Sequence, residues 1–277
     1  MKLDLSIPSP LAYFASLVQR DEGLPLLEAA ACLAQDEYPE LDVQQVLGDM
    51  DQLAARLKRR VAAGASDMDR LHTLGQFFFG DLGFGGNVND YYNPDNSYLN
   101  RVLHTRRGIP ISLAVLWLEL AQGLGLKAQG AGFPGHFLVQ ADLPVGRVVI
   151  DPFTGQSLGL AELRERIEEL HLPDGDLPLA LHLRPASPRQ ILARMLRNLQ
   201  EIHRAQQDWL RFVPVQDRLI ALLPDAWTEY RDRGLALAEL GDVGRAHADL
   251  ALYLRQARHA SDRERVAERL GELRRLL

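Results

Sequence analysis

The stretch GIPISLAVLWLELAQGLG, residues 108–125, decides which fold this sequence predicts. Pro110 suits the first position of a helix, where its missing N–H removes no hydrogen bond, and Gly123 and Gly125 are typical of a helix end. Between them, apolar side chains occupy nearly every face of the helix. A helix that is apolar all round is buried, so we expect residues 110–124 to form the central helix of a domain.

Three strands are expected after this helix, at residues 127–132, 135–140 and 147–150. The last two are separated by the short connection 141–146, and a hairpin centred there pairs residues whose numbers sum to 287. This register places His136 opposite Asp151, and directly opposed residues have Cβ atoms about 4.5–5.5 Å apart. The sequence therefore predicts a hydrogen bond between the imidazole and the carboxylate. Such a pair is the general base and its orienting group in a catalytic triad; alternatively, it only fastens the hairpin.

Helices are also expected in the first third of the chain. Apolar spacing and capping signals predict four of them: one opened by Pro10, one at residues 24–35, one at 42–62 and one that follows a capping box at 66–69. The next stretch, residues 80–100, is rich in glycine and asparagine but also holds Phe84, Tyr91, Tyr92 and Tyr98. Aromatic side chains inside such a polar stretch indicate an ordered loop packed on the domain.

The last third of the chain consists of helix pairs. Four prolines within residues 173–188 indicate a domain boundary. Residues 227–258 are typical of a tetratricopeptide unit, because Gly234 and Ala246 are spaced like the small residues at its helix crossing. The apolar seam of this unit is expected to contain Leu237, Leu240, Leu250 and Tyr253. The preceding stretch matches more weakly, a final helix is expected at residues 263–277, and a small helical bundle without a repeat is the alternative.

Composition narrows the possible functions. The chain has 277 residues, a length suited to two domains, and its 47% of apolar residues can form a core. Its net charge of −6 makes it a poor candidate for binding nucleic acid irrespective of sequence. The single cysteine, Cys32, cannot form an internal disulfide. We expect it to be a small buried apolar residue in a reducing, cytoplasmic setting.

Membrane and cofactor signals are missing from the sequence. No stretch approaches the ~20 apolar residues that span a bilayer, and residues 1–10 lack the pattern of a secretory signal. The sequence holds no Gly-x-Ser-x-Gly, His-Glu-x-x-His or Walker motif, and the histidines other than His136 lack metal-ligand spacing. We therefore expect no membrane contact, no cofactor and no metal site.

Four strings of the sequence carry a resemblance to a known family: YYNPDNSYLN at 91–100, RRGIPISL at 106–113, GFPGHFLV at 132–139 and DPF at 151–153. They resemble the bacterial SirB-type proteins, in which a transglutaminase-like region precedes tetratricopeptide repeats. The resemblance implies an α+β fold. A helical N-terminal region and a papain/transglutaminase-like core, with a buried helix packed on an antiparallel sheet, would precede all-α repeats.

The resemblance also implies a division of the chain into two domains. The transglutaminase-like domain would span residues 1–182, with a helical part at 1–79 and the core at 80–182. A helical domain similar to tetratricopeptide repeats would span residues 183–277.

The sequence departs from this family at the nucleophile. Active transglutaminase-like proteins open the buried helix with Gly-x-Cys, about fifteen residues before the glycine of a Leu-Gly pair. The pair here is Leu124-Gly125, so the cysteine position corresponds to Pro110, which has no nucleophile. Ser112 is the nearest substitute, although a serine at the third helical position also caps locally. The candidate catalytic residues are therefore Ser112, His136 and Asp151.

The same strings supply the candidate binding residues Tyr92, Asn93, Asn96, Arg107 and Pro110. A local basic cluster, formed by Arg101, His104, Arg106 and Arg107, precedes the buried helix. It could attract an anionic group to the N-terminus of the helix, or it is a solvated, salt-bridged surface.

Two functions remain open at this point. The first is a catalytically degenerate binding or regulatory protein that engages a protein or peptide partner through its C-terminal helices, since such arrays offer surfaces and not chemistry. The second is an acyl-transferase, or an amide or peptide hydrolase, that uses the triad Ser112, His136 and Asp151. We favour the first, because the position of the nucleophile is occupied by Pro110.

Overall fold

The computed structural model describes residues 8–170 and 177–276. The chain forms two compact units, which we describe separately. The core unit comprises Pro25–Ala34 and Glu40–Met195, and the repeat unit comprises Met1–Leu24, Gln35–Pro39 and Leu196–Leu277. The long helix α9 (Pro188–Ala205) contains the point at which they divide. The domain division predicted between residues 182 and 183 stays a prediction.

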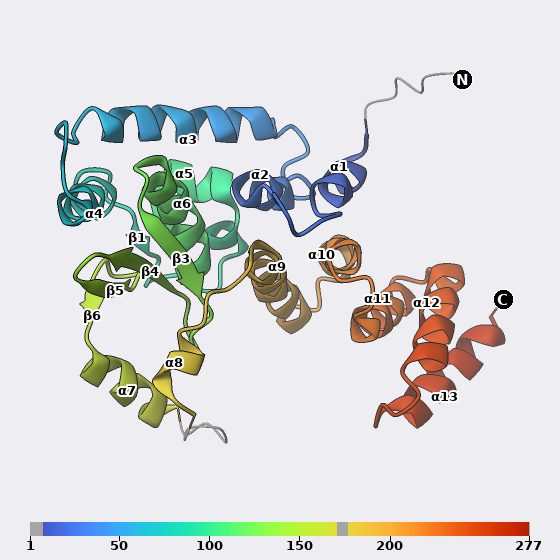
Figure 1. The fold of residues 1–277 in the computed structure, drawn as a ribbon. Coiled ribbons are helices and arrows are strands. Elements are labelled where there is room, and N and C mark those ends of the chain that lie inside the picture. Colours follow the sequence, from blue (N-terminus) through green and yellow to red (C-terminus); the bar gives the residue numbers. More distant parts are fainter. Residues whose placement is uncertain (1–7, 171–176, 277) are drawn as a thin grey trace. The chain divides into compact units, whose positions relative to one another are not determined.

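The core unit is built around α6 (Pro110–Gly123), as predicted. Eleven of its fourteen residues are buried, among them Trp117, because it contacts helices and the sheet on several sides. Figure 1 shows α6 beside β3 and below the long α3. The other helices of this unit are α2 (Leu26–Ala31), α3 (Val43–Lys58), α4 (Asp67–Gly75), α5 (Leu99–Thr105), α7 (Leu160–Glu169) and α8 (Leu179–His182).

Local capping signals fix where several of these helices begin. The Asp42 carboxylate accepts a hydrogen bond from the Gln44 amide at 2.9 Å at the start of α3. Ser66 and Asp69 form the predicted capping box of α4, each side chain accepting from the other residue's amide at 3.2 Å. Short irregular turns complete the unit: η1 (Cys32–Ala34), the π-helical η2 (Gln76–Asp81) and η3 (Pro94–Ser97).

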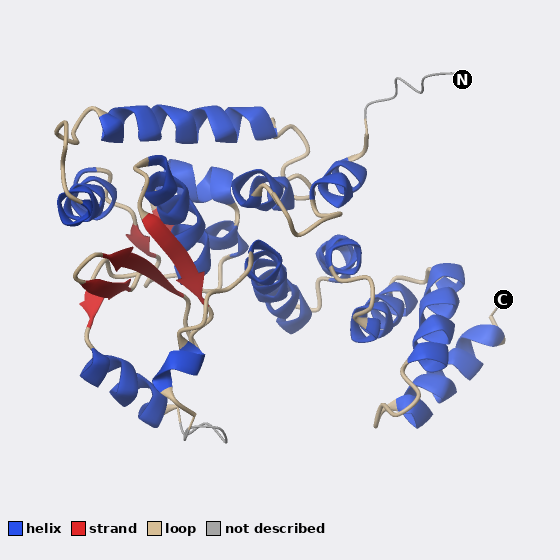
Figure 2. Ribbon diagram, viewed as in Figure 1, coloured by secondary structure: helices blue, strands red, loops and turns tan. Residues whose placement is uncertain are grey.

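The strands of the core unit form two sheets, shown in red in Figure 2. A four-stranded antiparallel sheet has the order β3–β4–β5–β6, with strands at Lys127–Ala131, Leu138–Leu143, Gly146–Ile150 and Ser157–Leu158. A parallel pair joins β1 (Gly85–Gly86) to β2 (Arg107–Gly108). This sheet and the helices around α6 confirm the α+β class. The sequence did not predict β1, β2 and β6, which are too short to show a pattern.

The register predicted for the β4–β5 hairpin is wrong. Val139 pairs with Ile150 and Leu143 with Gly146, so paired numbers sum to 289 and not 287. The connection is only Pro144 and Val145, because each strand extends further toward the turn than expected. The predicted strand at residues 135–140 is also displaced, because β4 begins only at Leu138 and leaves His136 in the turn before it. Asp151 directly follows the end of β5, so His136 and Asp151 are not an opposed pair within the ladder.

The repeat unit is all helical in the part of the chain that the structure describes. Besides the C-terminal part of α9, its helices are α1 (Pro10–Leu17), α10 (Trp209–Leu222), α11 (Trp227–Glu239), α12 (Val243–Gln256) and α13 (Arg263–Arg274). α12 begins 34 residues after α10, the length of a tetratricopeptide unit. Asp208 and Asp242 cap these two helices in the same way, each accepting from the backbone amide three residues on at 3.1 Å.

The crossing of α11 and α12 has the predicted small residues. A Cβ atom at Gly234 would lie 2.8 Å from the Leu250 side chain, so glycine permits the close approach. Ala246 is fully buried in the same core as Leu250 and Tyr253. Leu240, which was also expected in this seam, is 40% exposed because it stands at the end of α11.

Candidate functional site

The predicted histidine–aspartate pair is present in the core unit. His136 Nε2 lies 2.7 Å from Asp151 Oδ1, which confirms the predicted hydrogen bond. The Asp151 side chain is 3% exposed and that of His136 is 22% exposed. Because Nε2 faces the carboxylate, Nδ1 is the ring nitrogen left for a proton or a ligand. It makes no hydrogen bond to any residue that the structure describes.

Asp151 is held by more than its histidine. Oδ1 also accepts from the Phe153 amide at 2.9 Å, and Oδ2 accepts from Arg166 Nη1 of α7 at 3.2 Å. Burial by itself raises the pKa of Asp151, but hydrogen bonds from His136, Phe153 and Arg166 outweigh it and hold that pKa below its usual range. The carboxylate is therefore ionised at neutral pH and fixes the orientation of the imidazole.

The backbone of His136 is fixed by a turn and by a distant arginine. Its amide donates to the Phe133 carbonyl at 3.1 Å, and Gly135 takes a φ of +65° that favours glycine. Its carbonyl accepts from Arg194 Nη2 of α9 at 2.7 Å. Burial lowers the pKa of Arg194, and the nearby Tyr91 partly opposes this.

A chain of contacts links this pair to the start of α6. The Phe153 ring lies 6.4 Å from the His136 ring, edge to face. It also covers Gly86, where a Cβ atom would fall 2.2 Å from the ring carbons, and the Gly86 amide donates to the Phe153 carbonyl at 2.8 Å. Gly86 pairs in turn with Gly108, two residues before Pro110.

The Ser112 hydroxyl hydrogen bonds with the backbone. The hydroxyl donates to the Asn96 carbonyl at 2.6 Å and also lies within donating distance of the Ile109 carbonyl, at 3.0 Å. Its oxygen accepts from the Ile109 amide at 3.1 Å. Ser112 is fully buried, and a Cβ atom at Gly108 would lie 2.7 Å from its oxygen. No hydrogen bond joins Ser112 to His136, both of which the structure describes. The catalytic role of Ser112 stays a prediction.

Asn96 organises the loop that precedes α5. Its amide nitrogen donates to the carbonyls of Asp90 and Tyr91 at 2.6 and 3.1 Å, and its oxygen accepts from Asn87 at 3.0 Å. Its own carbonyl is the acceptor for Ser112. This buried amide thus joins the Asn-rich loop to the beginning of α6, which explains why the loop is ordered.

The other predicted binding residues differ in exposure. Asn93 caps η3 by accepting from the Asp95 amide at 3.0 Å, and Arg107 donates to the Gly83 carbonyl at 2.6 Å. Tyr92 is 75% exposed, whereas Pro110 is buried at the first position of α6. A role of these residues in binding stays a prediction.

The basic cluster before α6 is in part neutralised. Arg101 pairs with Asp95 at 2.9 Å, and the Arg106 guanidinium lies 4.6 Å from the centre of the Phe84 ring. Cys32 is fully buried, as expected of a small apolar residue. Among the described residues, no three His, Cys, Asp or Glu side chains gather as a metal site.

Arg166 and Arg194 are the site residues that the sequence did not indicate. Arg166 of α7 lies 15 residues from Asp151, and Arg194 of α9 lies 58 residues from His136. The sequence around an arginine on a helix does not show whether its guanidinium contacts a buried group or lies on the surface. Only the fold identifies them.

The buried helix, the antiparallel sheet and the His–Asp pair define a transglutaminase-like core, followed by helical repeats. Residues 44–197 match the transglutaminase-like superfamily, and residues 199–271 match the tetratricopeptide repeat. A UPF0162 protein of Xylella fastidiosa is 41% identical over 239 residues, 84% of each chain. A UPF0162 protein of Pseudomonas aeruginosa is 30% identical over 248 residues, 90% of each chain. The chain belongs to this bacterial family of transglutaminase-like, SirB-type proteins.

A crystal structure of menin, described as revealing the binding site for the Mixed Lineage Leukemia protein, aligns with 87% of this chain and 68% of its own. The TM-score is 0.41 and the identity 12%, a likeness too weak to carry an argument. In the described part of the chain, no helix has both the length and the apolar character needed to cross a membrane.

Proposed function

We propose that this chain is a binding or regulatory protein with a catalytically degenerate transglutaminase-like core, which engages a protein partner through its helical repeats. The observation that carries the proposal is the start of α6. By the register of Leu124-Gly125, Pro110 corresponds to the position at which the resemblance implies a thiol, and the nearest hydroxyl, Ser112, is buried and bonded to the backbone. The single buried cysteine also favours a reducing, cytoplasmic setting.

Energetics support this reading of Ser112. To attack a substrate, its hydroxyl would have to leave the Asn96 carbonyl and the Ile109 amide. Each buried polar group left unpaired costs about 1–3 kcal/mol. A serine also depends on contact with a general base, since its pKa is not lowered as that of a cysteine is. The hydrolase alternative therefore needs a rearrangement of the first turn of α6.

In this proposal the role of the His136–Asp151 pair is structural: it holds the segments of the site together. Asp151 joins the end of β5 to the loop of His136 and, through Arg166, to α7. The His136–Asp151 pair thus has a structural role that needs no nucleophile, because it connects the end of β5, the loop of His136 and α7.

Serine catalysis is tested by treating the full chain with a fluorophosphonate probe and looking for a covalent adduct by intact-protein mass spectrometry. We expect no adduct at Ser112 at neutral pH. Labelling that disappears in both Ser112→Ala and His136→Ala would instead establish the triad, because its members act as a unit. Ser187→Ala, which removes a serine that caps α9, is the matched control.

The repeat-mediated role is tested by photocrosslinking in bacterial cells. A benzophenone amino acid replaces Leu210 or Leu240 in the repeat unit, or Val145 in the core hairpin, all of which are exposed. Tetratricopeptide repeats are generally protein-interaction modules, so we expect a discrete crosslinked partner from the repeat positions and none from Val145. If neither repeat position gives a crosslinked species, the proposed role is wrong.

A further inference from the structure

Arg194 of α9 is a half-buried cation in the core unit that has no anionic partner. Its guanidinium donates to the His136 carbonyl at 2.7 Å and more weakly to the Phe133 carbonyl at 3.4 Å. No Asp or Glu among the described residues pairs with it. Burial lowers its pKa, and the side chain that opposes this is Tyr91. Carbonyl groups accept hydrogen bonds but carry no net charge, so the positive charge of Arg194 is left uncompensated.

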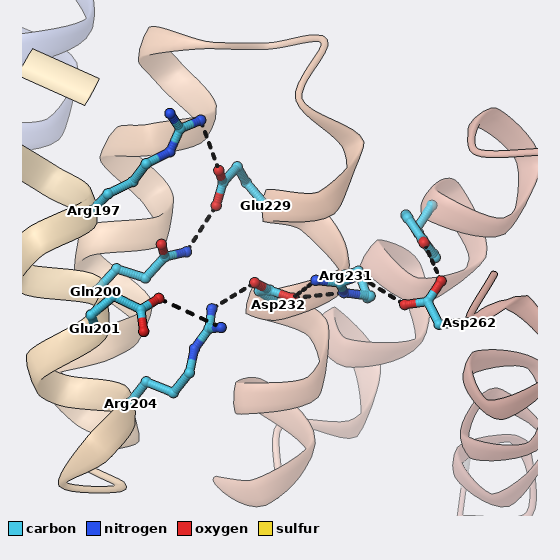
Figure 3. Close-up of polar contacts among 9 residues, drawn as sticks. Arg197, Gln200, Glu201, Arg204, Glu229, Arg231, Asp232 and Asp262 are labelled. Carbon is cyan, nitrogen blue, oxygen red and sulfur yellow. Dashed lines mark hydrogen bonds and ion pairs between the residues drawn. The ribbon is translucent and has the colours of Figure 1, made fainter. Parts of the chain in front are cut away.

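Two other arginines of the same helix do pair with carboxylates. Arg197 lies 3.6 Å from Glu229, and Arg204 lies 2.7 Å from Asp232 (Figure 3). A guanidinium that is partly removed from water loses hydration, and a nearby anion offsets that loss. Arg194 has lost hydration, since burial lowers its pKa. A bound anion would give it the carboxylate that the chain itself gives to the other two.

The groups around Arg194 do not neutralise it. Burial raises the pKa of Tyr91, which is therefore an uncharged phenol at neutral pH. Asp151 accepts from His136 at 2.7 Å and pairs with Arg166 at 3.2 Å. The charge of this carboxylate is thus matched by the guanidinium of Arg166, and Arg194 stays in excess.

A series of aromatic rings connects the neighbourhood of Arg194 to the imidazole of His136. The ring centres of Tyr92 and Tyr91 are 5.3 Å apart, and those of Tyr91 and Phe153 are 5.9 Å apart. Phe153 in turn lies 6.4 Å from the His136 ring. Tyr91 is 40% exposed and Tyr92 is 75% exposed, and they are the exposed aromatic side chains of the described residues. Exposed rings bury much apolar area when another ring is placed on them.

We infer that the core unit binds an aromatic carboxylate, whose carboxylate pairs with Arg194. Its aromatic ring lies against Tyr91, Tyr92 and Phe153. A guanidinium presents its N–H donors in a fork that matches carboxylate oxygens. The carbonyl partners of Arg194 engage Nη1 and Nη2, and Nε has no partner among the residues that the structure describes.

The ligand can be a free aromatic acid or the C-terminus of a peptide that ends in an aromatic residue, since both present the same two groups. The inference goes beyond the proposed function. There the His136–Asp151 pair is structural and the repeats engage the partner, whereas here the core unit has a ligand of its own.

The test measures affinity for the full chain by isothermal titration calorimetry. N-acetylphenylalanine is compared with its primary amide, which keeps the ring and lacks the charge, and with N-acetylalanine, which keeps the charge and lacks the ring. We expect N-acetylphenylalanine to bind at least about tenfold more tightly than either. Equal affinity for the acid and its amide, or for the two acids, would overturn the inference.

The source of the carboxylate is read from a tripeptide, acetyl-Ala-Ala-Phe. Tighter binding of the tripeptide than of N-acetylphenylalanine identifies a peptide C-terminus as the ligand, and equal or weaker binding identifies a free acid. Both results support recognition of the carboxylate and the ring.

Substitution on α9 locates the carboxylate. We expect Arg194→Gln to remove the preference for the acid over its amide. The control is Arg197→Gln, which removes the same charge from the same helix at a side chain that is 53% exposed. This control should keep the preference. Equal losses in the two variants would reveal only long-range charge and would contradict the inference.

Two further measurements do not depend on the folding of Arg194→Gln. In the wild-type chain, N-acetylphenylalanine should shift the NMR signals of the Arg194 Nε–H and of the His136 ring, and binding that shifts neither would overturn the inference. Tyr92→Ala changes an exposed ring. It should weaken N-acetylphenylalanine and leave N-acetylalanine unchanged, whereas equal effects on the two acids would contradict the placement of the ring.

The fate of the proposed function is read separately, from the crosslinks at Leu210 and Leu240 of the repeat unit. If these crosslinks form but the acid and its amide bind equally, the repeat-mediated role stands and the carboxylate inference falls. If the acid is preferred but no crosslink forms, the carboxylate inference stands and the repeat-mediated role falls.

Discussion

Asp151 is the single residue on which most of the core site depends. Its two oxygens accept from His136, from the Phe153 amide and from Arg166. Replacing it by asparagine keeps the shape but removes the charge that these donors face. Hydrogen bonds to a charged group contribute about 1.5–3 kcal/mol each. We expect Asp151→Asn to lower the free energy of unfolding by about 2–3 kcal/mol in urea titrations at pH 7.

The pH dependence of this effect has a definite sign. The folded-state pKa of Asp151 lies below its unfolded value of about 3.9. Its stabilising contribution is therefore complete above the unfolded pKa and is lost as the pH falls through the folded one. We expect this part of the acid dependence to be missing in Asp151→Asn. The control Asp142→Asn breaks an exposed pair with Arg147 and should change the free energy of unfolding little.

The start of α6 can be tested by restoring a thiol. In Pro110→Cys the sulfur would stand at the N-terminus of α6, which lowers a thiol pKa. The resemblance implies that this position faces His136, whose imidazole would lower the thiol pKa further. We expect iodoacetamide to alkylate it at pH 6 at least about tenfold faster than an unperturbed thiol, whose pKa is about 8.5. The buried Cys32 serves as the internal control. An equal rate after the further change His136→Ala would show that position 110 does not face the pair.

Helices and strands were predicted correctly where the signal lies within the element itself or directly beside it. The all-round apolar pattern was enough for α6, and one capping box was enough for the start of α4. The β4–β5 register was missed because Pro144-Val145 lacks the Asn-Gly signal that marks a two-residue turn. The hydrogen bond between His136 and Asp151 forms nonetheless, between residues that lie just outside β4 and β5.

The α11–α12 crossing depends on one glycine. A side chain at Gly234 would collide with Leu250, and overpacking costs about 1–3 kcal/mol. We expect Gly234→Val to lower the free energy of unfolding by at least about 2 kcal/mol, measured by thermal and urea unfolding. Gly271→Ala is the matched control, because a Cβ at that helical glycine meets nothing within 4 Å. It should stabilise the chain by about 0.5–1 kcal/mol; equal effects of the two would contradict the packing argument.

At the scale of the whole chain, the repeat unit is assembled from both ends of the sequence. Residues Met1–Leu24 and Gln35–Pro39 belong to the same compact unit as the C-terminal helices. Arg218 of α10 bonds both oxygens of Asp36 at 2.7 and 3.0 Å, and its guanidinium lies 5.3 Å from the centre of the Phe14 ring. No sequence pattern indicates a contact between residues 182 positions apart. The sequence therefore showed the helices but not which of them share a core.

This assembly gives the last prediction. The Arg218 side chain is 1% exposed, so Asp36→Asn would leave a buried cation without its carboxylate, which costs about 3 kcal/mol. Glu37→Gln breaks the neighbouring pair with Arg211, whose side chain is 54% exposed, and should cost less than about 1 kcal/mol. We expect amide hydrogen exchange in α10 to accelerate strongly in Asp36→Asn and little in Glu37→Gln. Equal protection of α10 in both variants would mean that the N-terminal residues contribute nothing to the repeat unit. In that case the C-terminal helices would not depend on the N-terminal residues for their stability.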